Sequence, residues 1–157
     1  MKTILVPVDF SDVTPQVLSV ASSMAAAFGS HVIIIYVAEP EPDFVGFEPG
    51  PPSVRLIVAR DLKAERQRLE TMKDRLVAEG RDATGLAVQG SAVERILHEA
   101  REQNAGLIVM GSHGHGALYE LLIGSVTQGV IKGAHCPIVI VPSKVGEKAQ
   151  LMGENRE

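Results

Sequence analysis

Short apolar runs alternate with amphipathic stretches along most of the chain. Runs with the length of buried strands occupy residues 4–8, 31–37, 83–90, 107–110 and 137–142. Between them, apolar residues recur three and four positions apart, which predicts helices at residues 15–28, 54–79, 91–100 and 126–132. Strands that alternate with helices are typical of a parallel sheet covered on both faces. We therefore predict an α/β fold with a single doubly wound domain.

Local signals mark where two of these helices begin and end. Thr14 is predicted to cap the first helix, with Pro15 in its first turn and Gly29 as its stop. Ser91, with a glutamate three positions later, has the spacing of a capping box at the start of the third helix. The proline-rich stretch 38–52 is predicted to be a loop.

Composition and charge exclude several classes of protein. The chain has 157 residues, a length typical of one domain, and its net charge of −4 lacks the basic excess that binds nucleic acid. Cys136 is the single cysteine, which excludes an internal disulfide, and we expect it to pack as a small apolar residue. Pro7 and Asp9 come too early for the apolar region of a signal peptide, and no run has the length of a membrane span. We expect a cytoplasmic protein that binds neither nucleic acid nor membranes.

Candidate chemistry follows two of the predicted strands. In doubly wound sheets, ligands bind at the carboxyl ends of the strands, where the strand order reverses. Asp9 and Ser11 follow the first strand. A carboxylate there can accept a hydrogen bond from a sugar hydroxyl, or it can cap the helix that follows. The fourth strand leads into the glycine-rich stretch VMGSHGHGALYELLIGSVTQGV, residues 109–130.

The glycines of residues 109–130 have a spacing that suits phosphate binding. Gly111 is followed after two residues by Gly114, and after nine more by Gly124 and Ser125 at the start of a predicted helix. Glycine lets the backbone approach a phosphate, and the free N–H groups of a helix N-terminus attract anions. Gly124, Ser125 and Val126 would supply these donors. The alternative is a simple turn with the Ser125 hydroxyl as a helix cap.

A metal site is the competing interpretation of the same stretch. His113 and His115 lie two residues apart, but zinc needs three or four ligands. The sequence offers no HExxH motif or cysteine–histidine cluster to complete the set. We therefore expect no metal held by protein ligands. A magnesium ion held mainly by nucleotide phosphates needs few protein ligands and is compatible with the sequence.

Four stretches carry a family resemblance: ILVPVDFS, VMGSHG, LLIGSVTQGVI and CPIVIVP. Together they resemble the universal stress protein family, in its ATP-binding branch. The resemblance covers residues 1–142 and leaves 143–157 as a polar C-terminal tail. It implies a five-stranded parallel sheet in the order 3-2-1-4-5 with helices on both faces, in which Asp9 and Gly111 would face each other. It also implies ATP as ligand and homodimers joined through the fifth strand, an apolar edge made of Ile138, Val139, Ile140 and Val141.

The resemblance further implies roles for individual residues. Asp9 would contact the ribose, the Val37 backbone would contact the adenine, and Met110 with Gly111 would form the floor near the ribose. The phosphates would lie in a cradle formed by Gly114, Gly124, Ser125 and Val126. The complete set expected at the nucleotide is Pro7, Val8, Asp9, Val37, Met110, Gly111, Gly114, His115, Gly124, Ser125 and Val126.

Several positions depart from the family pattern. His115 stands where a lysine or arginine is common, so a permanent cation is missing there. If this histidine points at the phosphates, binding is predicted to strengthen at low pH. The alternative is a solvent-facing histidine between Gly114 and Gly116. Gly129 and Gly133 are predicted to weaken the last helix by about 0.5–1 kcal/mol each relative to alanine.

Three functions from different classes fit these observations. The first is a regulatory module that reports stress or energy state through its bound nucleotide. The second is a slow ATPase or a nucleotide-dependent enzyme, although the chain lacks a Walker lysine and an evident base, so no catalytic residue is predicted. The third is a phosphate-accepting receiver domain, which needs an aspartate after the third strand, where this chain has Gln89 and Gly90. The sequence favours the binding module.

Overall fold

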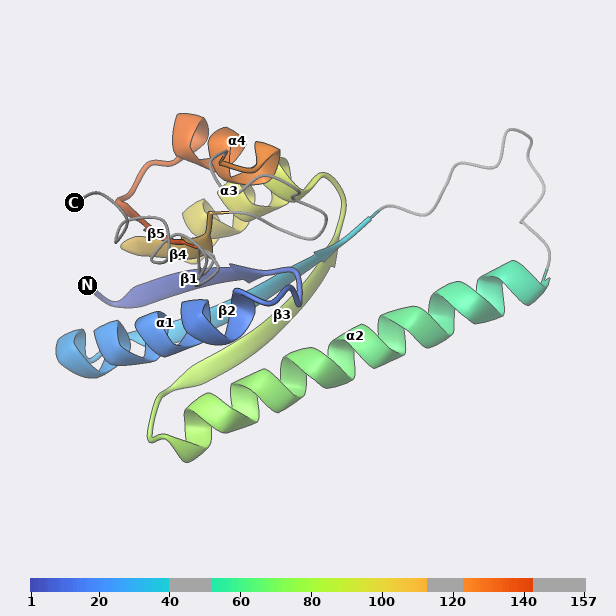
Figure 1. Ribbon diagram of the computed structural model, residues 1–157, viewed down its shortest axis with the longest axis horizontal. Helices are drawn as coiled ribbons and strands as arrows, with labels where there is room; N and C mark the ends of the chain where they lie inside the picture. Colours follow the sequence, from blue (N-terminus) through green and yellow to red (C-terminus); the bar gives the residue numbers. More distant parts are fainter. Residues whose placement is uncertain (40–51, 113–122, 143–157) are drawn as a thin grey trace, which may run out of the picture.

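The computed structural model describes residues 1–39, 52–112 and 123–142, which form a five-stranded parallel sheet in the order β3-β2-β1-β4-β5 (Figure 1). The strands are β1 (Thr3–Val8), β2 (His31–Ala38), β3 (Ala83–Gln89), β4 (Leu107–Gly111) and β5 (Ile138–Val141). The helices are α1 (Thr14–Phe28), α2 (Pro52–Ala78), α3 (Ala92–Glu102) and α4 (Ser125–Gly133). The predicted fold class and strand order are confirmed.

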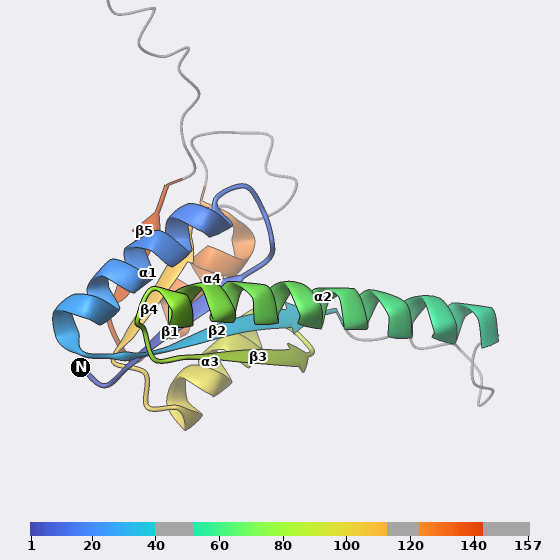
Figure 2. The same ribbon diagram turned by 90° about the horizontal axis from the view of Figure 1, so that it is seen from below.

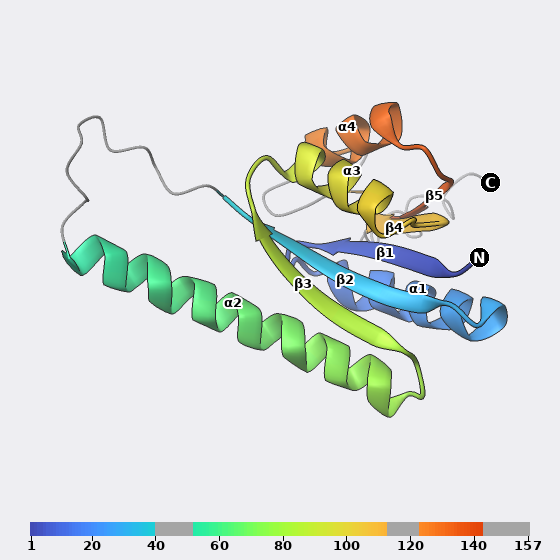
Figure 3. The same cartoon turned by 180° about the vertical axis from the view of Figure 1, so that it is seen from behind.

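Helices cover both faces of the sheet. α1 and α2 lie side by side on one face (Figure 2), and α3 and α4 lie on the other (Figure 3). Ile4 and Val6 of β1 share a buried cluster with Leu18 of α1, whereas Leu5 of β1 shares the opposite cluster with Ile96 of α3. Because β1 is buried on both faces, its apolar residues are consecutive rather than alternating.

The ends of α1 and α3 agree only in part with the sequence signals. α1 has Pro15 in its first turn and ends at Gly29, which takes the left-handed conformation with φ 61°. The prediction of Thr14 as its cap is wrong, because Val13 holds that position and Thr14 is buried in the helix's first turn. Ser91 does lie at the N-cap of α3, but its side chain makes no capping hydrogen bond, so the predicted capping box does not form.

α2 begins slightly earlier than the periodicity predicts. It starts at Pro52 rather than residue 54, since the fixed φ of proline suits the first positions of a helix. Its later turns pack on β3, where a Cβ atom added to Gly85 would lie 3.1 Å from Leu69 Cγ. Its first turns extend past the ends of the strands (Figure 3). Although α2 has 27 residues, no helix in the described ranges is long and apolar enough to cross a membrane.

The glycines of α4 have a packing role that the sequence analysis missed. A Cβ atom on Gly129 would lie 2.7 Å from Val93 Cγ2 of α3, and one on Gly133 would collide with Leu97 Cδ1 of the same helix. These positions therefore let α3 and α4 approach closely. Two glycines four positions apart on one helix face were the signal in the sequence that could have shown it.

Candidate functional site

A cavity of about 450 Å³ opens at the carboxyl ends of the central strands. β1 pairs with β2 over its whole length, from Thr3 to Val8, but with β4 only at Ile4 and Leu5. Beyond Leu5 the two neighbouring strands therefore separate, and the cavity lies between their ends. This is the point at which the strand order reverses, where ligands bind in open α/β sheets.

The cavity brings together the predicted site residues that the structure describes. They come from four separate elements or the turns next to them, and Asp9 and Gly111 both line the same cavity. The predicted residues on its wall are Pro7, Val8, Asp9, Val37, Met110, Gly111, Gly124, Ser125 and Val126. The other predicted residues, Gly114 and His115, lie outside the described residues, as does His113.

Further lining residues were not predicted from the sequence. Ile35 lies two positions before Val37 on the same face of β2, so strand alternation was the available signal. The first turn of α3 contributes Ala92, and its second turn contributes Ile96. The remaining unpredicted lining residues are Val13, Thr14, Val17 and Thr127. Most of these side chains are apolar, which gives the cavity the mixed lining that is common in small-molecule sites.

Asp9 is held in a tight turn at the end of β1. Its Oδ1 atom accepts hydrogen bonds from the Ser11 backbone N–H at 3.1 Å and from Ser11 Oγ at 2.5 Å. This is the local geometry by which aspartate side chains stabilise turns. α1 itself begins after Val13 and has no side-chain cap, so Asp9 orders the turn before the helix rather than capping the helix. The carboxylate consequently has a fixed position beside the cavity.

The first turn of α4 forms the opposite wall. Gly124 is the N-cap, and its N–H donates to the Ser112 carbonyl oxygen at 2.9 Å. The alternative interpretation, in which the Ser125 hydroxyl caps this helix, is wrong, because Gly124 is the N-cap and no side chain makes a capping hydrogen bond. The N–H groups at the start of a helix have no acceptor within it, and in α4 they belong to Ser125 and its successors. N–H groups in this position can donate to an anion in the cavity.

The electrostatics of the cavity favour a ligand with negative charge at one end. Three helices begin on its wall, at Thr14, Ala92 and Ser125, and each helix N-terminus carries a partial positive charge. Among the described lining residues, Asp9 is the only one with a charged side chain. Phosphates would thus be neutralised by backbone dipoles on the α4 side, while the carboxylate on the β1 side suits hydroxyl donors.

Metal-ligating side chains and Cys136 are the other candidate groups. Within residues 1–39, 52–112 and 123–142, no three histidine, cysteine, aspartate or glutamate side chains gather where they could hold a metal ion. Cys136 is half-buried against the core cluster beneath α3 and α4, as expected of a small apolar residue. Burial raises the pKa of its thiol, which lowers the reactive thiolate fraction.

Comparison with known proteins assigns the family. The sequence model of the universal stress protein family matches residues 1–142. The chain belongs to this family. A universal stress protein of Thermus aquaticus, encoded 3′ of a sulfhydrylase gene, is 37% identical over 141 residues, covering 89% of this chain and 98% of the relative.

Solved structures of universal stress proteins share the fold. Protein MJ0577 of Methanocaldococcus jannaschii superposes with a TM-score of 0.79 at 29% identity, covering 92% of this chain and 97% of that one. A universal stress protein solved in complex with cAMP superposes with a TM-score of 0.63 at 26% identity, covering 90% and 96% of the two chains. Binding of an adenine nucleotide is therefore found among structural neighbours of this universal stress protein.

Proposed function

We propose that this universal stress protein is an ATP-binding regulatory module of the family's ATP-binding branch. The observation that carries the proposal is the cavity between the ends of β1 and β4, with Asp9 on one side and the first turn of α4 on the other. The wall with Asp9 suits sugar hydroxyls, and the wall formed by α4 suits phosphates. A nucleotide carries both kinds of group. The neighbour that binds cAMP supports an adenine nucleotide as the ligand class.

The ligand's parts can be assigned to the wall residues. Asp9 accepts from the ribose, Val37 lies at the adenine, and Met110 with Gly111 lines the floor beneath the sugar. Gly124 permits close approach of the phosphates, while Ser125 and Val126 present N–H groups to them. Three helix N-termini around one cavity favour a triphosphate over a neutral or singly charged ligand. A magnesium ion would be held mainly by those phosphates.

We propose binding rather than turnover as the activity. Asp9 is engaged by Ser11, so it is placed to orient a hydroxyl rather than to activate water. The bound state would then be the signal, and the conformation of the residues around the cavity would report it.

The same proposal includes assembly through β5. The sheet order makes β5 an edge strand of the described sheet, and all four of its residues are apolar. Apolar edges are normally covered or paired in stable proteins. We therefore propose that two copies pair through Ile138–Val141 in a homodimer.

The direct test of ATP binding uses the full chain. Purified protein is denatured, and the released nucleotides are identified by mass spectrometry; stripped protein is then titrated with ATP by calorimetry. The proposal expects an adenine nucleotide in the released fraction and saturable ATP binding. Failure of stripped, folded protein to bind ATP with or without Mg²⁺ would refute it.

A further inference from the structure

Phe10 holds an unusual backbone conformation next to the candidate site. It lies between Asp9 and Ser11, and its φ of 61° is in the left-handed region. Among the described residues, Asn104 is the one other non-glycine residue with positive φ, and asparagine tolerates this conformation far better than phenylalanine does. Bulky residues keep such a conformation only where their surroundings impose it.

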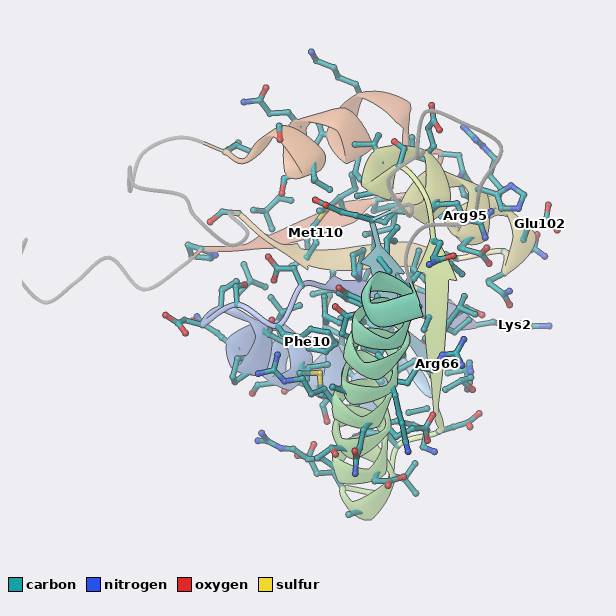
Figure 4. All side chains as sticks on the ribbon, turned by 90° about the vertical axis from the view of Figure 1, so that its right-hand side faces the viewer. Lys2, Phe10, Arg66, Arg95, Glu102 and Met110 are labelled. Atoms are coloured by element: carbon teal, nitrogen blue, oxygen red, sulfur yellow. The ribbon has the colours of Figure 1, made fainter. Side chains whose placement is uncertain are left out.

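The side chain of Phe10 is fixed by residues from two other elements. Its ring lies 4.7 Å from the ring of Tyr36 on β2, centroid to centroid, with an interplanar angle of 32°. The Arg68 guanidinium carbon lies 5.3 Å from the centre of the Phe10 ring. Figure 4 shows Phe10 beside α2, on the side of the sheet that α1 also covers. The aromatic contact with Tyr36 and the cation–π contact with Arg68 together hold the ring, and we call these two residues the clamp.

Tyr36 is in turn hydrogen-bonded to α2. Tyr36 donates its hydroxyl hydrogen to Glu65 Oε1 at 2.6 Å, so β2 and α2 are joined beside the ring. Burial and this hydrogen bond raise the pKa of the Tyr36 hydroxyl, which therefore stays protonated and remains a donor. Glu65 and Arg68 lie three positions apart on α2, so one face of this helix holds both aromatic residues.

Phe10 is also the central residue of the turn that carries Asp9. The left-handed residue between Asp9 and Ser11 bends the chain so that both the Ser11 N–H and its hydroxyl reach Asp9 Oδ1. A change of φ at Phe10 would separate these groups and release the carboxylate. Fixing the Phe10 ring would therefore also fix the Asp9 carboxylate. The ring itself packs against the core cluster on the face that α1 and α2 cover.

We propose that Phe10 is a positioning residue that, together with Tyr36 and Arg68, sets Asp9 for recognition of ribose hydroxyls. This inference rests on the proposed nucleotide binding and assigns a part of its specificity to residues of β2 and α2. The chemical class recognised is a vicinal sugar diol. The phosphate side of the cavity, on α4, is separate from the clamp and should not depend on it.

The test compares ATP with 2′,3′-dideoxy-ATP, which lacks the diol, by calorimetry on full-length protein. Phe10→Gly removes the ring but leaves the left-handed conformation accessible, so the turn becomes mobile without new strain. We expect its preference for ATP over the dideoxy nucleotide to fall about tenfold relative to wild type, with affinity for the dideoxy nucleotide little changed. Arg68→Ala should lower the preference by a smaller factor, and Arg66→Ala, an exposed arginine of the same helix, is the matched control.

A double-mutant cycle separates positioning from general loss of structure. If Phe10 acts through Asp9, Phe10→Gly should change the nucleotide preference no further in an Asp9→Ala background. Circular dichroism and thermal melting test whether each variant is folded. If Phe10→Gly does not fold, the nucleotide preference of Arg68→Ala tests the inference instead. Wild type that binds ATP, with variants that keep its full preference for the diol, would overturn this inference alone. Wild type that binds neither nucleotide would overturn the proposed function as well.

Discussion

Thr127 Oγ1 donates a hydrogen bond to the Gly111 carbonyl oxygen at 3.0 Å and so ties the first turn of α4 to the end of β4. Thr127 is 3% exposed, and both residues line the cavity. The Gly124 N–H bond to the Ser112 carbonyl oxygen makes a second link between the same two elements. The end of β4 and the first turn of α4, which both line the candidate site, are therefore joined by two hydrogen bonds.

Removing the Thr127 hydroxyl should weaken this connection. Thr127→Val keeps the shape of the side chain but leaves the Gly111 carbonyl without this donor, so we expect the free energy of unfolding to fall by about 1–2 kcal/mol. ATP affinity should fall as well, because α4 is less firmly placed. Urea unfolding and calorimetry measure the two effects. Thr71→Val is the matched control, since Thr71 bonds the Gln67 carbonyl on an exposed turn of α2; an equal loss of stability there would contradict the prediction.

A side chain at Gly124 should block the phosphates without unfolding the protein. Gly124 has φ −61° and ψ 154°, extended values that any residue adopts, so Gly124→Val introduces no backbone strain. Its side chain would occupy the phosphate side of the cavity. We expect at least a tenfold loss of ATP affinity with an unchanged circular dichroism spectrum, and a smaller loss for Gly124→Ala. Undiminished affinity in the valine variant would refute the assignment of α4 as the phosphate cradle.

Alanine should be worse than glycine at position 129, despite its higher helix propensity. Propensity favours Gly129→Ala by about 1 kcal/mol, but the new Cβ would overlap the branched Val93 side chain, and overpacking costs about 1–3 kcal/mol. We expect net destabilisation, measured by urea unfolding. At Gly133 the obstacle is the end of the flexible Leu97 side chain, so Gly133→Ala should cost less. A Gly129→Ala variant more stable than wild type would show that the helices can separate freely.

The contribution of Glu79 to stability should depend on pH. The Ser22 hydroxyl donates to Glu79 Oε2 at 2.8 Å, and this bond, followed by Arg75, lowers the pKa of the Glu79 carboxyl in the folded protein. A lowered folded-state pKa stabilises the protein above the unfolded-state pKa, and the effect is lost as pH falls through the lowered value. The stability difference between wild type and Glu79→Gln should therefore be larger at pH 7 than at pH 3. Urea titrations at both pH values measure it, and a constant difference would contradict the assignment.

Pairing through β5 should be sensitive to one backbone N–H. The Ile108 and Ser112 N–H groups donate to the carbonyls of Pro137 and Val141. Alternate residues of β5 thus face β4, and the backbone of Ile140 faces away. Ile140→Pro removes an outward N–H and should shift the protein from dimer to monomer.

Light scattering at micromolar concentration measures the change. Val139→Pro is the control, because its N–H faces β4 and its loss should destabilise the fold itself. Wild type that is monomeric with and without ATP would count decisively against pairing.

The sequence alone predicted the helices and strands. It also predicted which side of the candidate site suits hydroxyl groups and which side suits phosphates. A strand buried on both faces leaves a continuous apolar run, and an amphipathic helix leaves apolar residues three and four positions apart, so β1 and α1 could be predicted directly. The family resemblance supplied the strand order. Asp9 and Gly111 could then be placed at one crevice, since the carboxyl ends of parallel strands share an edge.

Tertiary structure decided which other residues complete that crevice. Neither the burial of Thr14 in the cavity wall nor the contact of Gly129 with Val93 leaves a local trace, because each depends on how one element lies against another. The same holds for Phe10, which the sequence shows only as an apolar residue after Asp9. Its backbone is left-handed, and its ring contacts an aromatic ring on β2 and an arginine on α2; such contacts form only once those distant segments meet.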